Sequence, residues 1–132
     1  AGLAALEFAG HKLAVPVILV LGHDNCGAVA AAESLMEERA SGTSLALLPG
    51  HLNALAEQIS RRLGSDARRA TVGDPPLSGA DAPTDAAAVN AAAAKTEVCV
   101  RSPLIRAAHE SGELALAHAM YTLDTGRVDF GD

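Results

Sequence analysis

Residues 15–29 read VPVILVLGHDNCGAV, and this stretch decides the fold class. The run Val15–Leu21 is β-branched or aliphatic at every position except Pro16, which a strand tolerates near its start. A strand that is apolar on both sides is typical of the interior of a parallel sheet covered by helices. Gly22 ends the run, and residues 28–39 favour a helix. Strand, turn and helix in this order form the first half of a βαβ unit, so we predict an α/β fold with a central, mainly parallel sheet flanked by helices.

The turn after the strand holds two residues suited to binding a metal. His23 and Cys26 lie three positions apart, at the carboxyl end of the strand and the start of the helix, where α/β sheets place ligand sites. Imidazole nitrogen and thiolate sulfur are ligand types that Zn²⁺ prefers. The backbone N–H groups of Gly27 and Ala28 at the helix start favour a thiolate or another small anion. A His-x-x-Cys pair alone also fits a reactive thiol without metal at Cys26, plain anion binding by the turn, or two unrelated residues.

Further elements follow from apolar spacing, helix caps and turns. We predict helices over residues 2–13, 47–63, 86–100 and 102–109, and strands over 114–121 and 128–130. Residues 65–85 are rich in Asp, Gly, Pro, Ser and Thr and are predicted to form a loop insertion. Two or three strands are too few to cover four or five helices in a doubly wound sheet. We therefore expect residues 1–132 to form a partial domain, or a domain whose remaining strands come from another chain.

Several other residues are expected to have structural roles, such as capping a helix or forming a turn. Asp24 and Asn25 are expected to cap the helix that follows them, and Asp85 to cap the alanine-rich helix. Gly126 is expected at the turn position that requires a positive φ, and Glu7 is a candidate for a buried polar contact. Four histidines show no spacing that suggests a site and are interpreted as surface residues or satisfied core residues: His11, His51, His109 and His118.

The composition of the chain indicates how its core is built and which classes of binding partner are excluded. Apolar residues make up 49% of the chain but aromatic residues only 2%, so small aliphatic side chains must build the core. The net charge of −6 argues against binding to a nucleic acid, which needs a basic stripe. The arginines at 61, 62, 68 and 69 are interpreted as a solvated helix face or loop. No run reaches the ~18 apolar residues of a membrane span, and no signal peptide is recognisable. We expect a cytoplasmic protein with no membrane or nucleic-acid partner.

Two stretches resemble β-class carbonic anhydrases. Residues 17–29, VILVLGHDNCGAV, look like the second half of that family's zinc site, where a G-H-x-x-C-G-A segment follows a core strand. Residues 121–128, YTLDTGRV, are similar to the family's Y-x-L-x-x-G-x-V turn. The resemblance spans nearly the whole chain, with residues 65–85 the least similar part. It implies a β-carbonic anhydrase-like fold, His23 and Cys26 as ligands of Zn²⁺, reversible hydration of CO₂ to bicarbonate and a proton, and a homodimer or larger homo-oligomer.

The resemblance also implies residues that this sequence does not contain. The family has a third zinc ligand, a cysteine, in a C-x-D-x-R motif upstream of the helix that opens this chain. The Asp of that motif either binds zinc as a fourth ligand or pairs with the Arg and leaves water on the metal; neither this catalytic Asp nor this Arg is found here. Cys99 lacks this context and is interpreted as a buried helix residue. We therefore expect a chain that lacks the N-terminal portion of such an enzyme, binds zinc weakly and turns over little CO₂ alone, because a tight zinc site needs three or four ligands.

Two alternatives remain open at this point. The first is a non-catalytic carbonic-anhydrase-like module that serves assembly or bicarbonate binding. The second is a thiol-based redox or anion-binding α/β domain that uses Cys26 at a helix N-terminus.

Overall fold

The computed structural model describes residues 2–42, 48–64 and 85–131. These residues form both helices and strands. In chain order they are α1 (Gly2–Lys12), β1 (Val17–His23), α2 (Gly27–Ser41), α3 (Leu52–Leu63), α4 (Ala86–Arg101), α5 (Pro103–Glu110), β2 (Ala115–Tyr121) and β3 (Val128–Phe130). This order confirms the predicted α/β class.

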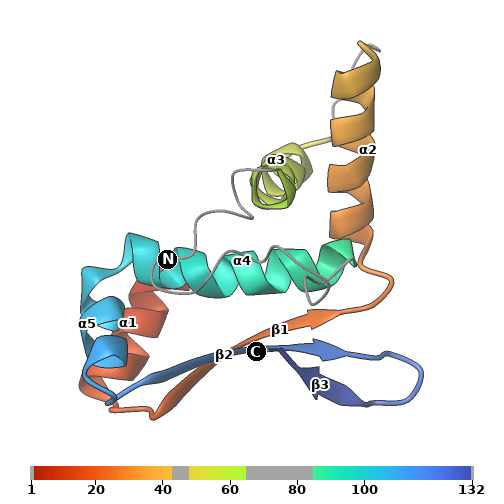
Figure 1. Cartoon of the computed structure of the whole chain (residues 1–132). Coiled ribbons are helices and arrows are strands. Elements are labelled where there is room, and N and C mark those ends of the chain that lie inside the picture. Colours follow the sequence, from red (N-terminus) through yellow and green to blue (C-terminus); the bar gives the residue numbers. More distant parts are fainter. Residues whose placement is uncertain (1, 43–47, 65–84, 132) are drawn as a thin grey trace.

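The described strands form one sheet in the order β1-β2-β3. β1 and β2 are parallel and pair from Val17 with Ala115 to His23 with Tyr121. β3 returns antiparallel to β2 through a turn in which Gly126 has φ 71°, as expected from the sequence. The sheet is therefore mainly parallel, as predicted, and its parallel strands both end at the position of His23 (Figure 1).

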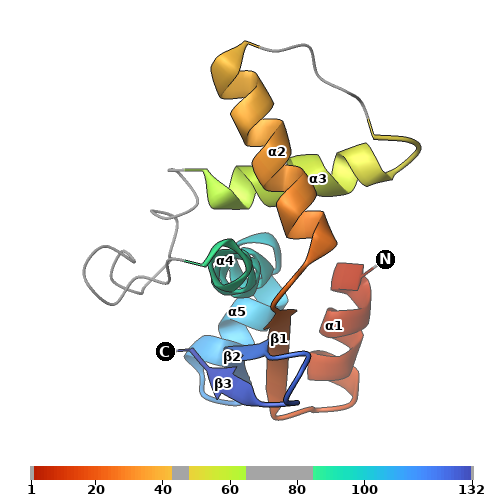
Figure 2. The ribbon, with the colours of Figure 1, turned by 90° about the vertical axis from the view of Figure 1, so that its right-hand side faces the viewer.

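The helices divide the interior into two clusters. Helix α4 lies along one face of β1 and β2, while α1 and α5 lie together at the end where β1 begins (Figure 1). Helices α2 and α3 cross each other beyond α4 (Figure 2). One cluster joins α2, α3 and α4, and the other joins α5 to the sheet, with α1 packed against it. The buried members of the first are Val29, Ala32, Ile59, Leu63, Ala87 and Val89, and those of the second are Ile18, Ile105 and Leu114.

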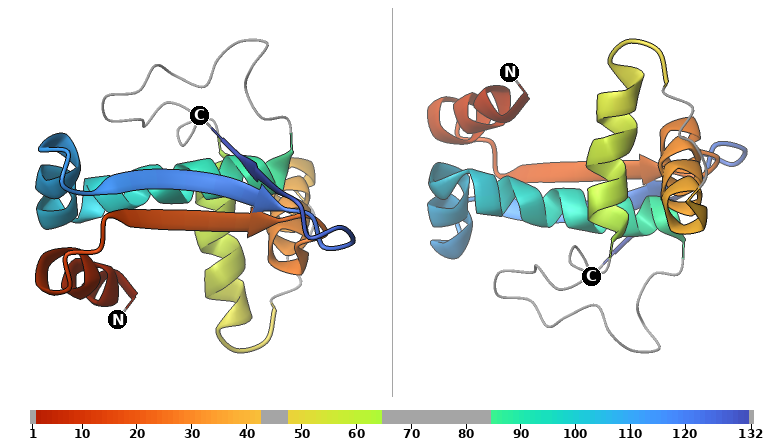
Figure 3. Two further views of the ribbon diagram at one scale, coloured as in Figure 1. Left: turned by 90° about the horizontal axis from the view of Figure 1, so that it is seen from below. Right: turned by 90° about the horizontal axis from the view of Figure 1, so that it is seen from above.

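The opposite face of the sheet is uncovered within the described residues. Viewed from below, β1 and β2 lie in front of α4 with no described element over them (Figure 3). The side chains of Val17, Leu19 and Leu21 are 49%, 43% and 51% exposed, whereas Ile18, facing the other way, is 7% exposed. The expectation of a strand buried on both faces is therefore wrong for the described part of the chain. Among the described elements, helix α4 covers one face only, and β1 has a neighbouring strand on one side only.

The helix predictions differ from the structure mainly at their ends. Asp85 caps α4 as expected, since its side-chain oxygen accepts a hydrogen bond of 3.3 Å from the N–H of Ala87. Ser102 caps α5 in the same way. Helix α3 begins at Leu52, later than the predicted start at residue 47. Apart from Asp85, the predicted loop insertion lies outside the described residues.

Candidate metal centre

The sheet and helix α2 bring the two predicted metal ligands into one turn. His23 is the last residue of β1, and Cys26 is the N-cap of α2, with the extended backbone angles φ −74° and ψ 110°. Both residues are half-buried. The predicted placement at the carboxyl end of a parallel strand is thus confirmed, while metal binding by these residues stays a prediction.

The tautomer of His23 follows from its hydrogen bond. Its Nδ1 lies 2.7 Å from the backbone oxygen of Asp24. A carbonyl oxygen can only accept, so Nδ1 must be the protonated nitrogen. The lone pair of Nε2 is then available, which is the state that a neutral imidazole needs to bind a metal ion.

Asp24 ties this turn to the β2–β3 hairpin. Its backbone N–H donates to the backbone oxygen of Tyr121 at 3.2 Å, which extends the β1–β2 pairing by one step. Its carboxylate oxygen accepts a 2.9 Å hydrogen bond from the N–H of Leu123, 99 positions away in the sequence. The expected capping role of Asp24 and Asn25 is wrong, because the cap of α2 is Cys26 and makes no side-chain hydrogen bond. The carboxylate of Asp24 is bonded to the hairpin, and Asn25 bends the chain with φ 50°.

Close packing fixes the strand end beneath the turn. A Cβ atom on Gly22 would lie 2.6 Å from the sulfur of Met120 and 3.1 Å from the Cβ of Ala91 on α4. A side chain at this position would therefore displace Met120 and crowd Ala91, since α4 lies close to the backbone of β1 here.

The start of α2 leaves backbone donors for an anion. The first helical hydrogen bond runs from the N–H of Ala30 to the oxygen of Cys26. The N–H groups of Gly27 and Ala28 precede it, and no side chain caps them. Gly27 is exposed and Ala28 half-buried, so this end of the helix is accessible. Anion binding by these two residues stays a prediction.

The donor set fits zinc in type but not in number. Among residues 2–42, 48–64 and 85–131, no group of three or more His, Cys, Asp or Glu side chains is placed to hold a metal ion. Cys99 lies on α4 and is half-buried, where the sequence predicted a buried residue. It forms no disulfide with Cys26. His23 and Cys26 therefore make two of the three or four ligands that a zinc site requires.

Comparison with known proteins places this arrangement in a family. The sequence model of the carbonic anhydrase family matches residues 1–128. The fold matches that of a Coccomyxa β-carbonic anhydrase solved in complex with acetazolamide, with 26% identity and a TM-score of 0.66. The chain belongs to the β-carbonic anhydrase family. The β-carbonic anhydrase CcaA is also similar, with 26% identity and a TM-score of 0.61. None of the curated proteins compared with the chain matches it significantly.

The chain spans about half the length of these β-carbonic anhydrase structures. The match covers 96% of this chain and 51% of the Coccomyxa chain, and 98% of this chain and 57% of CcaA. A chain from a study of two tetrameric β-carbonic anhydrases of the ascomycete Sordaria macrospora shares the fold, with 22% identity and a TM-score of 0.58; the match covers 96% of this chain and 57% of that chain.

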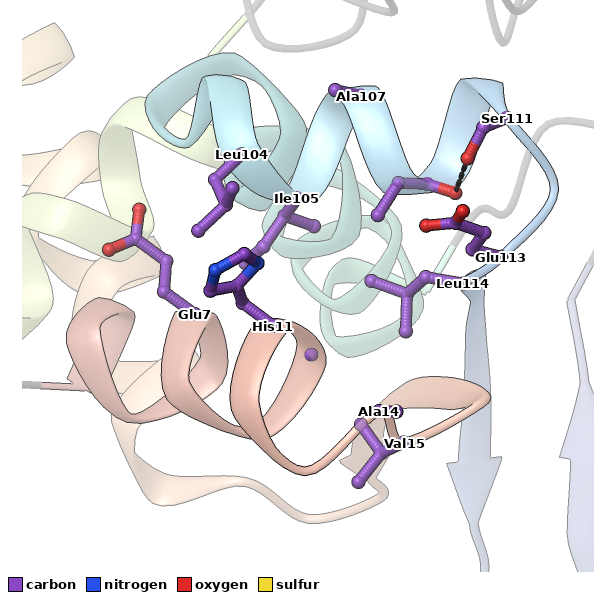
Figure 4. Close-up of a pocket in the computed structure, with 12 residues that line it drawn as sticks. Glu7, His11, Ala14, Val15, Leu104, Ile105, Ala107, Ser111, Glu113 and Leu114 are labelled. Atoms are coloured by element: carbon purple, nitrogen blue, oxygen red, sulfur yellow. Dashed lines mark hydrogen bonds between the residues drawn. The ribbon is translucent and has the colours of Figure 1, made fainter.

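A cavity lies in another part of the molecule, away from His23 and Cys26. It has a volume of about 610 Å³ and lies between α1 and α5, with Glu7, His11 and Glu113 among its lining residues (Figure 4). Glu7 accepts a 2.6 Å hydrogen bond from the hydroxyl of Ser102, so its expected polar contact is confirmed. Because the cavity shares no residue with the ligand turn, it is not the metal centre of this family.

The remaining histidines take different positions. His11 is exposed at the rim of that cavity, and His51 is exposed next to α3. The Nδ1 of His109 is 3.0 Å from the backbone oxygen of Leu114. His118 is buried in β2, beside Gly131. These positions agree with the interpretation as surface and core residues.

The structure also bears on the expected surroundings of the protein. No described helix is both long and apolar enough to cross a membrane.

Proposed function

We propose that His23 and Cys26 are two ligands of a zinc centre that catalyses the reversible hydration of CO₂ to bicarbonate and a proton. The family supports the reaction, and the ligand turn supports the assignment of residues. The observation on which the proposal rests most is the hydrogen bond from Nδ1 of His23 to the oxygen of Asp24, because it leaves Nε2 free to coordinate a metal.

The sheet edge beside His23 is the place where a further ligand fits. β1 pairs with β2 on one side, and its other side has no partner strand among the described residues. A parallel strand added there would end next to His23, since the carboxyl ends of parallel strands meet at one edge of a sheet. We infer that the missing ligand comes from such a strand, supplied from outside the described residues of this chain.

The uncovered sheet face supports assembly of the protein with further polypeptide. Val17, Leu19 and Leu21 are large apolar residues on one side of β1 that are 43–51% exposed. Phe130 on β3 is 69% exposed. Several exposed large apolar residues on one sheet are typical of an interface. The tetrameric state of the Sordaria macrospora enzymes agrees with a homo-oligomer, which we propose for this protein.

Each part of the turn has a task in this reaction. A bound zinc ion supplies the acidification of water that hydration of CO₂ at neutral pH requires. His23 and Cys26 hold the ion, and Asp24 orients the imidazole through its backbone oxygen. The N–H groups of Gly27 and Ala28 attract the anionic thiolate and the bicarbonate product. CO₂ and bicarbonate are thus the proposed substrate and product.

Variants of the two ligands test the proposal. In the protein assembled with the strand that supplies the missing ligand, we expect His23→Ala and Cys26→Ala to lower zinc affinity and to abolish zinc-dependent CO₂ hydration measured with a pH indicator in stopped flow. His51→Ala and Cys99→Ala are matched controls outside the turn and should leave both unchanged. Full zinc affinity and full hydration activity in either ligand variant would refute the assignment.

A direct measurement separates the half-site from a complete site. Because two ligands hold zinc weakly, these 132 residues alone should contain well under one zinc ion per chain after dialysis. Stoichiometric zinc, near one ion per chain, would contradict this expectation and show that the chain completes its own site.

The incomplete donor set favours one alternative, a non-catalytic member of the family. In that case the complete assembly would show no CO₂ hydration activity, although it contains both His23 and Cys26. A thiol-based function of Cys26 makes a different prediction, namely rapid alkylation of Cys26 that added zinc does not slow. In our proposal zinc protects Cys26 from alkylation, because the thiolate is bound to the metal.

A further inference from the structure

A basic groove lies between helices α3 and α4. It has a volume of about 500 Å³, and its walls include Arg61 and Arg62 of α3 and Arg101 of α4. Among the described residues that line it, Glu97 is the only acidic one. Three arginines and one glutamate give this described lining a formal excess of two positive charges, in a chain whose net charge is −6. From the sequence, Arg61 and Arg62 are interpreted as part of a solvated helix face or loop. In the structure they line a concave site together with Arg101 of another helix.

Glu97 holds two of these arginines in fixed positions. One carboxylate oxygen accepts a 2.6 Å hydrogen bond from Nε of Arg62, and the other accepts a 3.1 Å hydrogen bond from a terminal nitrogen of Arg101. Burial alone would raise the pKa of Glu97, but these two partners outweigh burial and hold the pKa below its ordinary value. Glu97 is therefore ionised at neutral pH, and the two guanidiniums are ordered before any ligand arrives. Such preorganisation lowers the entropic cost of binding.

Arg61 has donors to offer a ligand. It makes no hydrogen bond or ion pair with any residue in the described ranges. Arg101 uses one terminal nitrogen on Glu97, so part of its guanidinium is also available. Planar guanidinium groups match the oxygens of phosphate and pair with them through two parallel hydrogen bonds.

The lining of the groove also includes two apolar residues, alongside the polar Gln58 and Thr96. Ala93 and Val100 of α4 line it beside the arginines, and Val100 is 49% exposed. The groove thus combines an excess of two positive charges with an open apolar surface. A ligand that complements both parts has a dianionic head and a small apolar body.

We propose that this groove binds an organic phosphate monoester, with the phosphate on Arg61 and Arg101 and the organic group against Val100. The groove shares no residue with the turn of His23 and Cys26. The proposal therefore does not depend on the zinc centre, and either proposal can fail without affecting the other.

Calorimetric titration with phenyl phosphate tests the site. Loss of a charge-assisted hydrogen bond costs about 1.5–3 kcal/mol, so we expect Arg61→Gln to weaken binding by about tenfold or more. Because Arg61 contacts no described partner, this variant should fold like the unaltered protein, which circular dichroism checks. The double variant Arg61→Gln with Arg101→Gln should bind more weakly still. Arg127→Gln, on the distant hairpin, is the matched control and should bind normally.

A second pair of titrations separates the two parts of the ligand. Val100→Ser should weaken phenyl phosphate but leave inorganic phosphate unchanged, because only the ester has an apolar group for Val100 to contact. Absence of phenyl phosphate binding at millimolar concentration would overturn the proposal. So would equal affinity of Arg61→Gln and the Arg127→Gln control. Equal effects of Val100→Ser on both probes would overturn the assignment of a monoester.

Discussion

Replacing Asp24 by alanine should damage the metal centre without touching a proposed ligand. The substitution removes the carboxylate that accepts the 2.9 Å hydrogen bond from the N–H of Leu123. It leaves the backbone oxygen that accepts from His23 and the backbone N–H that donates to Tyr121. The ligand turn would then be joined to the hairpin by the backbone alone. His23 should still adopt its tautomer but in a less restricted orientation.

The size of the effect follows from the bond that is lost. A hydrogen bond to a charged group contributes about 1.5–3 kcal/mol, and partial exposure of this one favours a value of about 1–2 kcal/mol in unfolding free energy. Residues that orient metal ligands change metal affinity by about 10–100-fold when mutated. We therefore expect Asp24→Ala to lower zinc affinity by about tenfold, beyond its cost in stability.

Two variants and two assays make this prediction sharp. Guanidinium unfolding measures stability, and competition with a chromophoric chelator measures zinc affinity. Asp24→Asn keeps an oxygen that can accept from Leu123 and should restore most of both quantities. Asp124→Ala removes the same type of residue from the adjacent turn and should change neither. The reasoning is refuted if Asp24→Ala binds zinc as tightly as Asp124→Ala does.

Three further substitutions probe packing, capping and charge elsewhere in the fold. Gly22→Ala should destabilise the protein by about 1–3 kcal/mol in thermal unfolding, because the new Cβ would meet Met120; an unchanged melting temperature would contradict this contact. Ser102→Ala should lower the free energy of unfolding by about 1–3 kcal/mol, because Ser102 is fully buried, caps α5 and donates a hydrogen bond to Glu7. A loss no larger than that from replacing an exposed serine would contradict this. The pKa of Glu97 is held low by two arginines, so its stabilisation is complete above the ordinary value of 4.5 and disappears as pH falls through the lower folded pKa. Between neutral and acidic pH, the free energy of unfolding should therefore fall less in Glu97→Gln than in the unaltered protein. Identical pH profiles of the two proteins would refute this.

The sequence predicted the parts of the site that depend on local order. A β-branched run, a glycine and a helix-forming segment place His23 and Cys26 on a strand-turn-helix, because neighbouring residues alone determine each of these elements. Caps such as Asp85 and Ser102 are predictable for the same reason, since they bond to residues two or three positions away.

Long-range contacts could not be predicted in this way. The bond partner of Asp24 is 99 positions away, and it exists because β1 and β2 end at the same level of the sheet. A sequence read locally assigns Asp24 to the nearest helix start, which is wrong. A useful signal would have been the parallel register of β1 and β2, which places the turn after β1 against the turn after β2.

The burial of β1 shows a different limit. Val17, Leu19 and Leu21 have the composition of a strand covered on both faces, but the described residues cover only one. In our proposal, the composition of the strand reflects its environment in an assembly with further polypeptide. The face that the described residues leave uncovered is the surface on which we expect further polypeptide to pack.

The coordination of a metal ion by His23 and Cys26 is tested most directly with cobalt in place of zinc. The protein is titrated with Co²⁺ to saturation while thiolate-to-cobalt charge-transfer absorption is recorded in the near ultraviolet. We predict that this absorption appears in the unaltered protein and in Cys99→Ser, is absent in Cys26→Ser, and requires a higher Co²⁺ concentration in His23→Ala. Absorption that persists in Cys26→Ser, or that disappears in Cys99→Ser, would contradict the assignment of the metal centre.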